Sequence, residues 1–332
     1  MAHAAHSRRT TTYQRALALF AAAGSAWVFV LVTLGAFTTS IGAGMAFPDW
    51  PLSNGSINPH GWLRDIAMFA EHSHRLSGMM MGLITIGLVV WLWLREERAW
   101  VRRLGLWALG IVILQGIIGG QRVTLNHIEV PGFHMSLGEM LRIPHGILAQ
   151  IYVCLLIAIA VALSRSWIEG TAPVGAGVRR IGVICTALVL MQLVIAATMR
   201  HNGAGLAIYS FPYSTPDGHW LPAQWNFPVA IHFAHRAMAV VLAVALSIFA
   251  WALRRDRAAT IGMRAGASAL MTLLVLQILL GALVVIGGRQ ADVTTAHVVV
   301  GALTLTVTFF LTWLAHRDAI EGVAPLATRS RA

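Results

Sequence analysis

Four histidines stand near the start of long apolar stretches in this chain, and their side chains could bind a metal or a cofactor. A carboxylate, Glu71, precedes the first of them by three positions, and a cation, Arg75, follows it directly. Ionisable side chains within an apolar segment are costly to bury, so a functional role is the first hypothesis for them. The four histidines are His74, His145, His235 and His297.

The spacing of these residues indicates an internal repeat. His235 follows His74 by 161 positions, whereas His297 follows His145 by 152, a difference that we assign to a longer third outer connection in the first half. Self-similarity at a nearly fixed offset is typical of a duplicated structural unit. At the same offset of 161, Arg75 matches Arg236 and the segment 42–46 matches 203–207. At an offset of 162, Leu114-Gln115 matches Leu276-Gln277, and Gly119 matches Gly281.

The composition indicates the class of protein. Of the 332 residues, 57% are hydrophobic and 11% are charged, and the mean hydropathy is +0.71. Soluble domains carry roughly 25% charged residues. A helix needs about 20 apolar residues to cross a bilayer, and eight such windows predict an all-α integral membrane protein. The predicted spans are 16–41, 68–94, 104–123, 141–163, 181–199, 229–253, 265–286 and 293–315.

The net charge of +11 comes from arginine alone, which supplies all 24 basic residues. Arginines cluster near the first span and on alternate connections: Arg8, Arg9 and Arg15; Arg95, Arg98, Arg102 and Arg103; Arg165, Arg179 and Arg180; Arg254, Arg255, Arg257 and Arg264. Because cytoplasmic loops carry an excess of positive charge, this pattern predicts that both termini are cytoplasmic. We therefore interpret the positive charge as a signal of membrane topology and not as a nucleic-acid-binding surface. Since the first residues form no signal peptide, we expect a bacterial plasma membrane.

This orientation places all four histidines in one outer layer. The second, fourth, sixth and eighth spans enter from the outer side, and each carries its histidine within its first turns. Because each half holds four spans, the second half enters the membrane in the same orientation as the first. We therefore predict eight transmembrane helices in two parallel-repeat four-helix bundles. The expected N-terminal domain covers 16–165, and the C-terminal domain covers 178–316.

Histidines at matching depth on two facing helices are suited to binding heme. Heme iron takes two axial ligands, whereas a zinc site more often gathers three or four ligands close together. For any single histidine a packed polar contact would be the default, but four at one depth, duplicated with the repeat, favour heme ligation. Arg75 and Arg236 each follow a histidine directly and could pair with heme propionates.

The motifs that contain these residues resemble the heme A synthase family. The resemblance rests on Glu71-x-x-His74-Arg75, the Pro-Asp-Trp-Pro at 48–51, Ile143-Pro144-His145-Gly146 with Gln150, His235-Arg236 and His297, and it extends over about 31–311. Many bacterial members carry a cysteine pair in the first outer loop. That loop has no cysteine here, so a redox role for such a pair does not carry over.

The resemblance implies oxidation of the C8 methyl of heme O to a formyl group, which gives heme A for terminal oxidases. It implies that His74 and His145 hold the substrate heme in the catalytic first half, and that His235 and His297 hold a b-type heme. Glu71 matches the family's catalytic glutamate, which positions or deprotonates water or stabilises developing charge. Heme O synthase, an electron-transfer partner and membrane lipid are the implied partners.

The two halves differ at one position that matters for chemistry. Glu71 aligns with His232 at the offset of 161, one turn before the first histidine of each half. A carboxylate at this position can accept a proton or stabilise a cationic intermediate, whereas a neutral imidazole adds no negative charge, so we expect the first half to be catalytic. In one alternative, Glu71 is merely an ion-pair partner of Arg75. In others, the protein is a non-catalytic di-heme b-type electron carrier linked to quinol, or a heme transporter.

Overall fold

The computed structural model describes residues 12–132 and 135–322, so Arg8 and Arg9 of the predicted cytoplasmic tail lie outside it. Within these ranges the chain is helical and forms no strand. Eight segments are long and apolar enough to span a membrane, which confirms the predicted number. They are α1 (Arg15–Ser40), α2 (Ile66–Arg95), α3 (Ala99–Thr124), α4 (Leu137–Met140) with α5 (Arg142–Ala162), α7 (Ala176–His201), α8 (Phe227–Arg255), α9 (Ile261–Ile286) and α10 (Ala291–Ala315).

Side-chain caps set the start of two helices that carry histidines. Asp65 accepts a hydrogen bond from the third residue of α2 at 2.8 Å, and Asn226 accepts one from the third residue of α8 at 3.0 Å. Such residues satisfy backbone N–H groups that have no partner within the helix. The two caps are 161 positions apart. His74 and His235 therefore stand at the same step of their helices.

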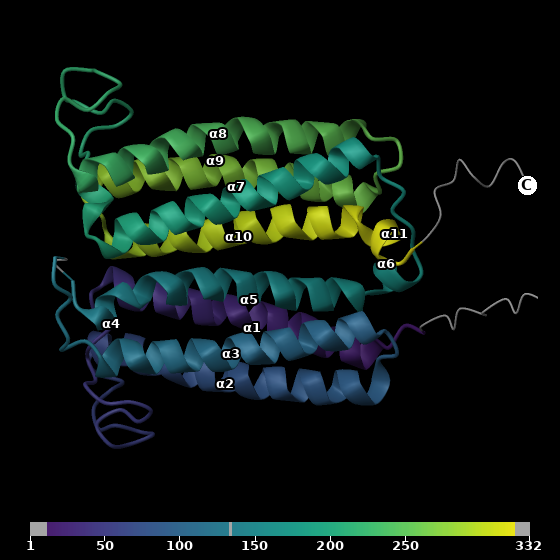
Figure 1. The fold of residues 1–332 in the computed structure, drawn as a ribbon, viewed down its shortest axis with the longest axis horizontal. Coiled ribbons are helices and arrows are strands. Elements are labelled where there is room, and N and C mark those ends of the chain that lie inside the picture. The colour runs from purple at the N-terminus through teal and green to yellow at the C-terminus, as the bar shows by residue number, and fades with distance from the viewer. Residues whose placement is uncertain (1–11, 133–134, 323–332) are drawn as a thin grey trace, which may run out of the picture.

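Two groups of four helices lie side by side (Figure 1). One core is buried among α1, α2, α3 and α5, and a second among α7, α8, α9 and α10. The groups meet where α1 and α5 pack against α10, and where α5 packs against α7. The long loops after α1 and α7 lie at one end of the molecule, and the short helices α6 (Arg165–Ile168) and α11 (Arg317–Ile320) at the other. The four helices that carry the histidines all begin at the loop end.

The outer faces of the helices are suited to lipid. Large apolar side chains are exposed along them, including Leu83 and Ile86 on α2 and Val240 and Val244 on α8. A water-soluble protein rarely exposes apolar surface on this scale. The protein is therefore a multi-pass membrane protein, as its composition predicted.

Side chains at both ends of the bundle join the two groups of helices. At the loop end, Arg200 of α7 donates a hydrogen bond to Ser40 Oγ of α1 at 2.9 Å. Thr295 of α10 donates to the same oxygen at 3.0 Å. At the opposite end, Arg98 before α3 pairs with Glu321 after α11 at 3.1 Å. These contacts position the two halves relative to each other.

Candidate functional site

His235 on α8 and His297 on α10 form a pair in the second group of helices. Their ring centres are 6.4 Å apart and their planes are inclined by 67°. Two imidazoles that bind one metal ion from opposite sides place their ring centres roughly 6 Å apart, because each metal–nitrogen bond is about 2 Å long. Nδ1 of each ring is buried without a hydrogen-bond partner. The pair therefore fits the two axial positions of a heme iron.

His74 on α2 and His145 on α5 form the corresponding pair in the first group. His74 Nδ1 lies 3.2 Å from the carbonyl oxygen of Leu31, so we assign the ring hydrogen to Nδ1. This assignment leaves the lone pair of Nε2 for a metal ligand bond. His145 Nδ1 is buried without a hydrogen-bond partner. The structure thus brings His235 and His297 into ring contact and places His74 and His145 on the corresponding helices of the first group.

Glycines leave room for three of these rings. A Cβ atom at Gly35 of α1 would stand 2.7 Å from His74 Cε1, and one at Gly281 of α9 would stand 3.1 Å from His297 Cε1. One at Gly119 of α3 would stand 3.3 Å from the same atom of the α5 histidine. Carbon atoms prefer separations of about 3.5–4.0 Å. Gly119 and Gly281 are also the glycines that match at the offset of 162 in the repeat.

Three glutamines lie beside the histidines. Gln115 donates to the carbonyl oxygen of His145 at 2.9 Å, and Gln192 donates to that of the α8 histidine at 3.0 Å. Gln277 Nε2 lies 3.4 Å from His297 Nε2. Oε1 of each glutamine is buried without a partner. Unpaired buried polar atoms are rare in proteins, and here they support a site for a bound group. Sequence reasoning missed these roles, although Gln115 and Gln277 recur at the offset of 162.

Glu71 is 3% exposed, and both of its carboxylate oxygens accept hydrogen bonds. Oε1 pairs with Arg75 at 2.6 Å, and Oε2 accepts from the N–H groups of Ala46 at 2.6 Å and Phe47 at 3.3 Å. The ion pair that we considered as an alternative is therefore present. The same carboxylate also fastens the first outer loop one helical turn from His74.

The second half repeats this arrangement with an imidazole in place of the carboxylate. His232 Nδ1 accepts from the N–H of Ile208 at 3.2 Å, and Ile208 lies 161 positions after Phe47. Arg236 donates to the carbonyl oxygen of Ile208 at 2.9 Å. The guanidinium of Arg75 makes the equivalent bond to Phe47 at 3.2 Å. The frameworks are equivalent, and the group one turn before the first histidine differs.

The first outer loop folds over the end of α2. Arg75 Nη1 donates to the carbonyl oxygens of Asp49 at 2.7 Å and Leu52 at 2.6 Å. The Asp49 carboxylate accepts from the N–H groups of Asn54 and Gly55, both at 2.7 Å. Although slight burial acts to raise it, these N–H groups hold the pKa of Asp49 below its ordinary value. The loop is therefore a folded cover held by Arg75, and Arg236 holds the second loop in the same way.

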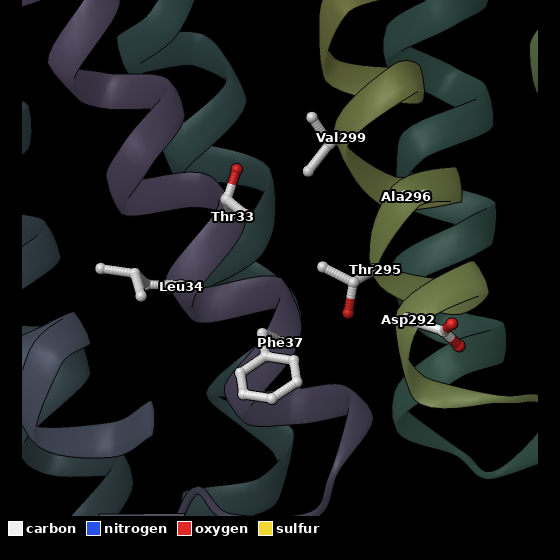
Figure 2. A pocket seen from close by; sticks show the side chains of 7 residues that line it. All are labelled: Thr33, Leu34, Phe37, Asp292, Thr295, Ala296 and Val299. Atoms are coloured by element: carbon white, nitrogen blue, oxygen red, sulfur yellow. The ribbon is translucent and has the colours of Figure 1, made fainter. Parts of the chain in front are cut away.

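An open cleft of about 520 Å³ lies between α1 and α10. Figure 2 shows Thr33 and Phe37 of α1 opposite Thr295 and Val299 of α10. None of its seven lining residues is one of the four histidines. We therefore place the candidate site at the histidine pairs and not in this cleft.

Comparison with known proteins identifies the family. The sequence model of the COX15-CtaA family, described as cytochrome oxidase assembly protein, matches residues 18–309. This chain belongs to that family. All residues of the two histidine pairs, together with Gly35 and Glu71, lie inside the matched range.

Similar proteins are named heme A synthase. That of Symbiobacterium thermophilum is 28% identical over 285 residues, which cover 82% of this chain and 87% of the relative. That of Sphingopyxis alaskensis is 28% identical over 339 residues, covering 90% and 91%. That of Paracoccus denitrificans is 27% identical over 328 residues, covering 84% and 82%. The similarity thus extends over most of both chains.

Proposed function

We propose that this protein is a heme A synthase, an oxidoreductase that converts the C8 methyl of heme O into a formyl group. The names of relatives that match over most of their length support this reaction. In this proposal His74 and His145 bind the substrate heme. His235 and His297 bind a resident b-type heme, and the spacing of their rings supports this assignment.

One difference between the halves carries the proposal. Glu71 and His232 make equivalent contacts with their outer loops, but only Glu71 brings a carboxylate close to a histidine pair. An electron carrier with two hemes would need no such distinction. A site that oxidises a methyl group does need one, because positive charge develops there and water must be oriented.

The residues of the first half have distinct roles in this proposal. When bound, the heme iron supplies the redox chemistry. His74 and His145 hold the porphyrin, and Glu71 stabilises developing positive charge and orients or deprotonates water. Arg75 and Arg236 hold the outer loops over the cofactor sites. The loops in turn restrict the access of bulk water to these sites.

The architecture of this proposal follows the repeat. The N-terminal domain covers 16–165 and the C-terminal domain 178–316, as parallel repeats with both termini in the cytoplasm. Both heme sites then lie toward the outer face of a bacterial plasma membrane. Contacts that recur at the offset of 161, and outer loops at one end of the molecule, support this arrangement. Heme O synthase would supply the substrate, and an electron-transfer partner would accept the electrons.

Chromatographic identification of the hemes in the purified protein tests this function. We expect heme b together with heme O, hydroxylated heme O or heme A. Heme b alone, at two per chain, would contradict the synthase and indicate the di-heme electron carrier. Reversible loss of a chemically unchanged heme would indicate a transporter.

A further inference from the structure

Arg122 is a partly buried cation near the loop end of α3. Its Nη2 atom donates a hydrogen bond to the carbonyl oxygen of Gly44 in the first outer loop. Its Nε atom is buried without a hydrogen-bond partner. A guanidinium can donate five hydrogen bonds. Arg122 therefore keeps donor capacity inside the protein that none of the described residues satisfies.

No described carboxylate forms an ion pair with Arg122. Glu71 is the carboxylate whose charge acts on it, and Glu71 is already paired with Arg75 at 2.6 Å. The neighbouring Arg142 adds a second positive charge, although it lies 3.5 Å from Glu139. A buried charge without a partner is strongly unfavourable. Because Glu71 is paired with Arg75 and Arg142 with Glu139, Arg122 has no described carboxylate of its own and is suited to bind an anion.

Arg122 follows Gly119 by three residues on α3, and a Cβ atom at Gly119 would stand 3.3 Å from His145 Cε1. Its partner Gly44 precedes by two residues Ala46, whose N–H donates to Glu71 at 2.6 Å. The cation therefore lies beside the position that we assign to the substrate porphyrin. Arg75 and Arg236, which directly follow His74 and His235, contact the outer loops instead. Both Nη atoms of Arg75 donate to loop carbonyls, and so do both Nη atoms of Arg236.

The repeat shows how the two halves differ at this place. The α3 and α9 segments match at an offset of 162, and the residue at that offset from Arg122 is Val284. A Cβ atom at Gly205, which matches Gly44, would stand 3.6 Å from Cδ of Arg289, an exposed residue beyond the end of α9. The first half thus carries a partly buried arginine within the helix, and the second half carries an exposed one after it. This difference accompanies the difference between Glu71 and His232.

We propose that Arg122 binds a propionate carboxylate of the porphyrin held between His74 and His145. This inference rests on the proposed function, because it takes the first pair as the substrate site. A tetrapyrrole with two propionates is the chemical class of ligand that combines a flat iron chelate with anionic groups. Arg122 acts as a binding and orienting residue and takes no part in the oxidation.

Esterified porphyrin gives a direct test. Purified protein with its resident heme is titrated with iron protoporphyrin IX and, separately, with its dimethyl ester, which lacks the anionic charge. Binding is followed by the Soret difference spectrum, and a His74→Ala variant identifies binding to the first site. Hydrogen bonds to charged groups predict that the wild type prefers the free acid by about tenfold or more.

Two variants remove this preference in different ways. Arg122→Gln keeps a donor for Gly44 but loses the charge, so the free acid and the ester should bind with nearly equal affinity. In Gly44→Ala, a Cβ atom would collide with the guanidinium and displace it, so the preference should also fall. Arg142→Gln is the matched control, because it removes a nearby cation that already has Glu139, and it should keep the preference.

The outcomes are distinct. Loss of the preference in Arg122→Gln and Gly44→Ala, with its retention in Arg142→Gln, supports the proposal. A merely structural role would weaken the binding of both porphyrins equally and leave their ratio unchanged, which would overturn it. Absence of any preference in the wild type would overturn it as well. If the wild type binds neither porphyrin in a His74-dependent manner, the proposed function itself fails.

Discussion

At the scale of single residues, Glu71 combines a structural contact with a position suited to chemistry. Its carboxylate pairs with Arg75 and accepts two loop N–H groups, yet it also lies one turn from His74. His232 makes the matching loop contact in the second half without a negative charge. Because the structural contact occurs in both halves, it does not by itself require a carboxylate. Charge is therefore the property of Glu71 to test.

Replacing Glu71 with Gln removes the charge but keeps an oxygen that can accept from the loop N–H groups. We expect folding and heme content to be retained and formyl production to fall by about a hundredfold or more. Heme extraction and chromatography measure the product. His232→Gln is the matched control and should have a milder effect. Heme A production at the parent rate in Glu71→Gln would refute the division of labour between the halves.

Replacing His235 or His297 with Ala should abolish the stably bound b-type heme, because a six-coordinate site loses one axial imidazole. Low-spin absorption and EPR spectra of the purified variants measure this loss. The matched control is His232→Ala, which removes a buried imidazole from the same helix as His235. Unchanged low-spin spectra in both ligand variants would show that these histidines are not the ligands.

At the scale of helices, glycine positions determine how closely a neighbouring helix approaches a histidine ring. Gly35, Gly119 and Gly281 lie on three different helices, and a Cβ atom at each would contact a ring. A side chain at these positions must therefore move the imidazole or separate the helices. The requirement depends on packing between helices, so hydropathy alone did not predict it.

Gly281→Ala should disturb the resident heme, because the new Cβ atom would stand 3.1 Å from His297 Cε1. Overpacking of this kind costs about 1–3 kcal/mol. We expect altered EPR g-values and faster loss of heme on warming. Gly116→Ala is the matched control, since a Cβ atom there would meet nothing within 4 Å. Equal heme retention in the two variants would show that the close contact does not matter.

The parts that the sequence predicted depend on local patterns, and the parts that it missed depend on packing. The apolar windows located all eight spans, although α3 extends beyond its predicted 104–123 to Ala99–Thr124 because polar turns continue the helix. The fourth span begins with a separate turn, α4, before the predicted start at 141, and the capping box on Ser136 that starts this turn was not recognised. Arg122 and Arg200 contact Gly44 and Ser40, which are distant in sequence. Such partners emerge only when the helices are assembled.

At the scale of the whole molecule, the two helix groups place all their long loops at one end (Figure 1). Arginine clusters lie at the other end, such as Arg98 directly before α3 with Arg102 and Arg103 in its first turns. If positive charge sets the orientation, the end with the loops faces outward. Both histidine pairs then lie nearer the outer surface than the cytoplasm.

Topology reporters test this orientation directly. Fusions that end after Arg103 and after Arg257 should report the cytoplasm, and fusions that end at Asn54 and at Asp217 should report the outside. Paired fusions of alkaline phosphatase and green fluorescent protein provide the measurement, since each is active on one side only. A cytoplasmic result at either outer loop would refute the shared outer layer.

The contacts that join the halves have a consequence for the electron transfer that the proposed function requires. Ser40 with Arg200 at one end, and Arg98 with Glu321 at the other, hold the two helix groups in a fixed relation. Tunnelling of an electron depends steeply on the gap between two redox centres. If hemes occupy both histidine pairs, as proposed above, a constant gap makes the rate between them depend on their relative reduction potentials. Weakening either contact would then make that rate vary from molecule to molecule, with no change at the four histidines.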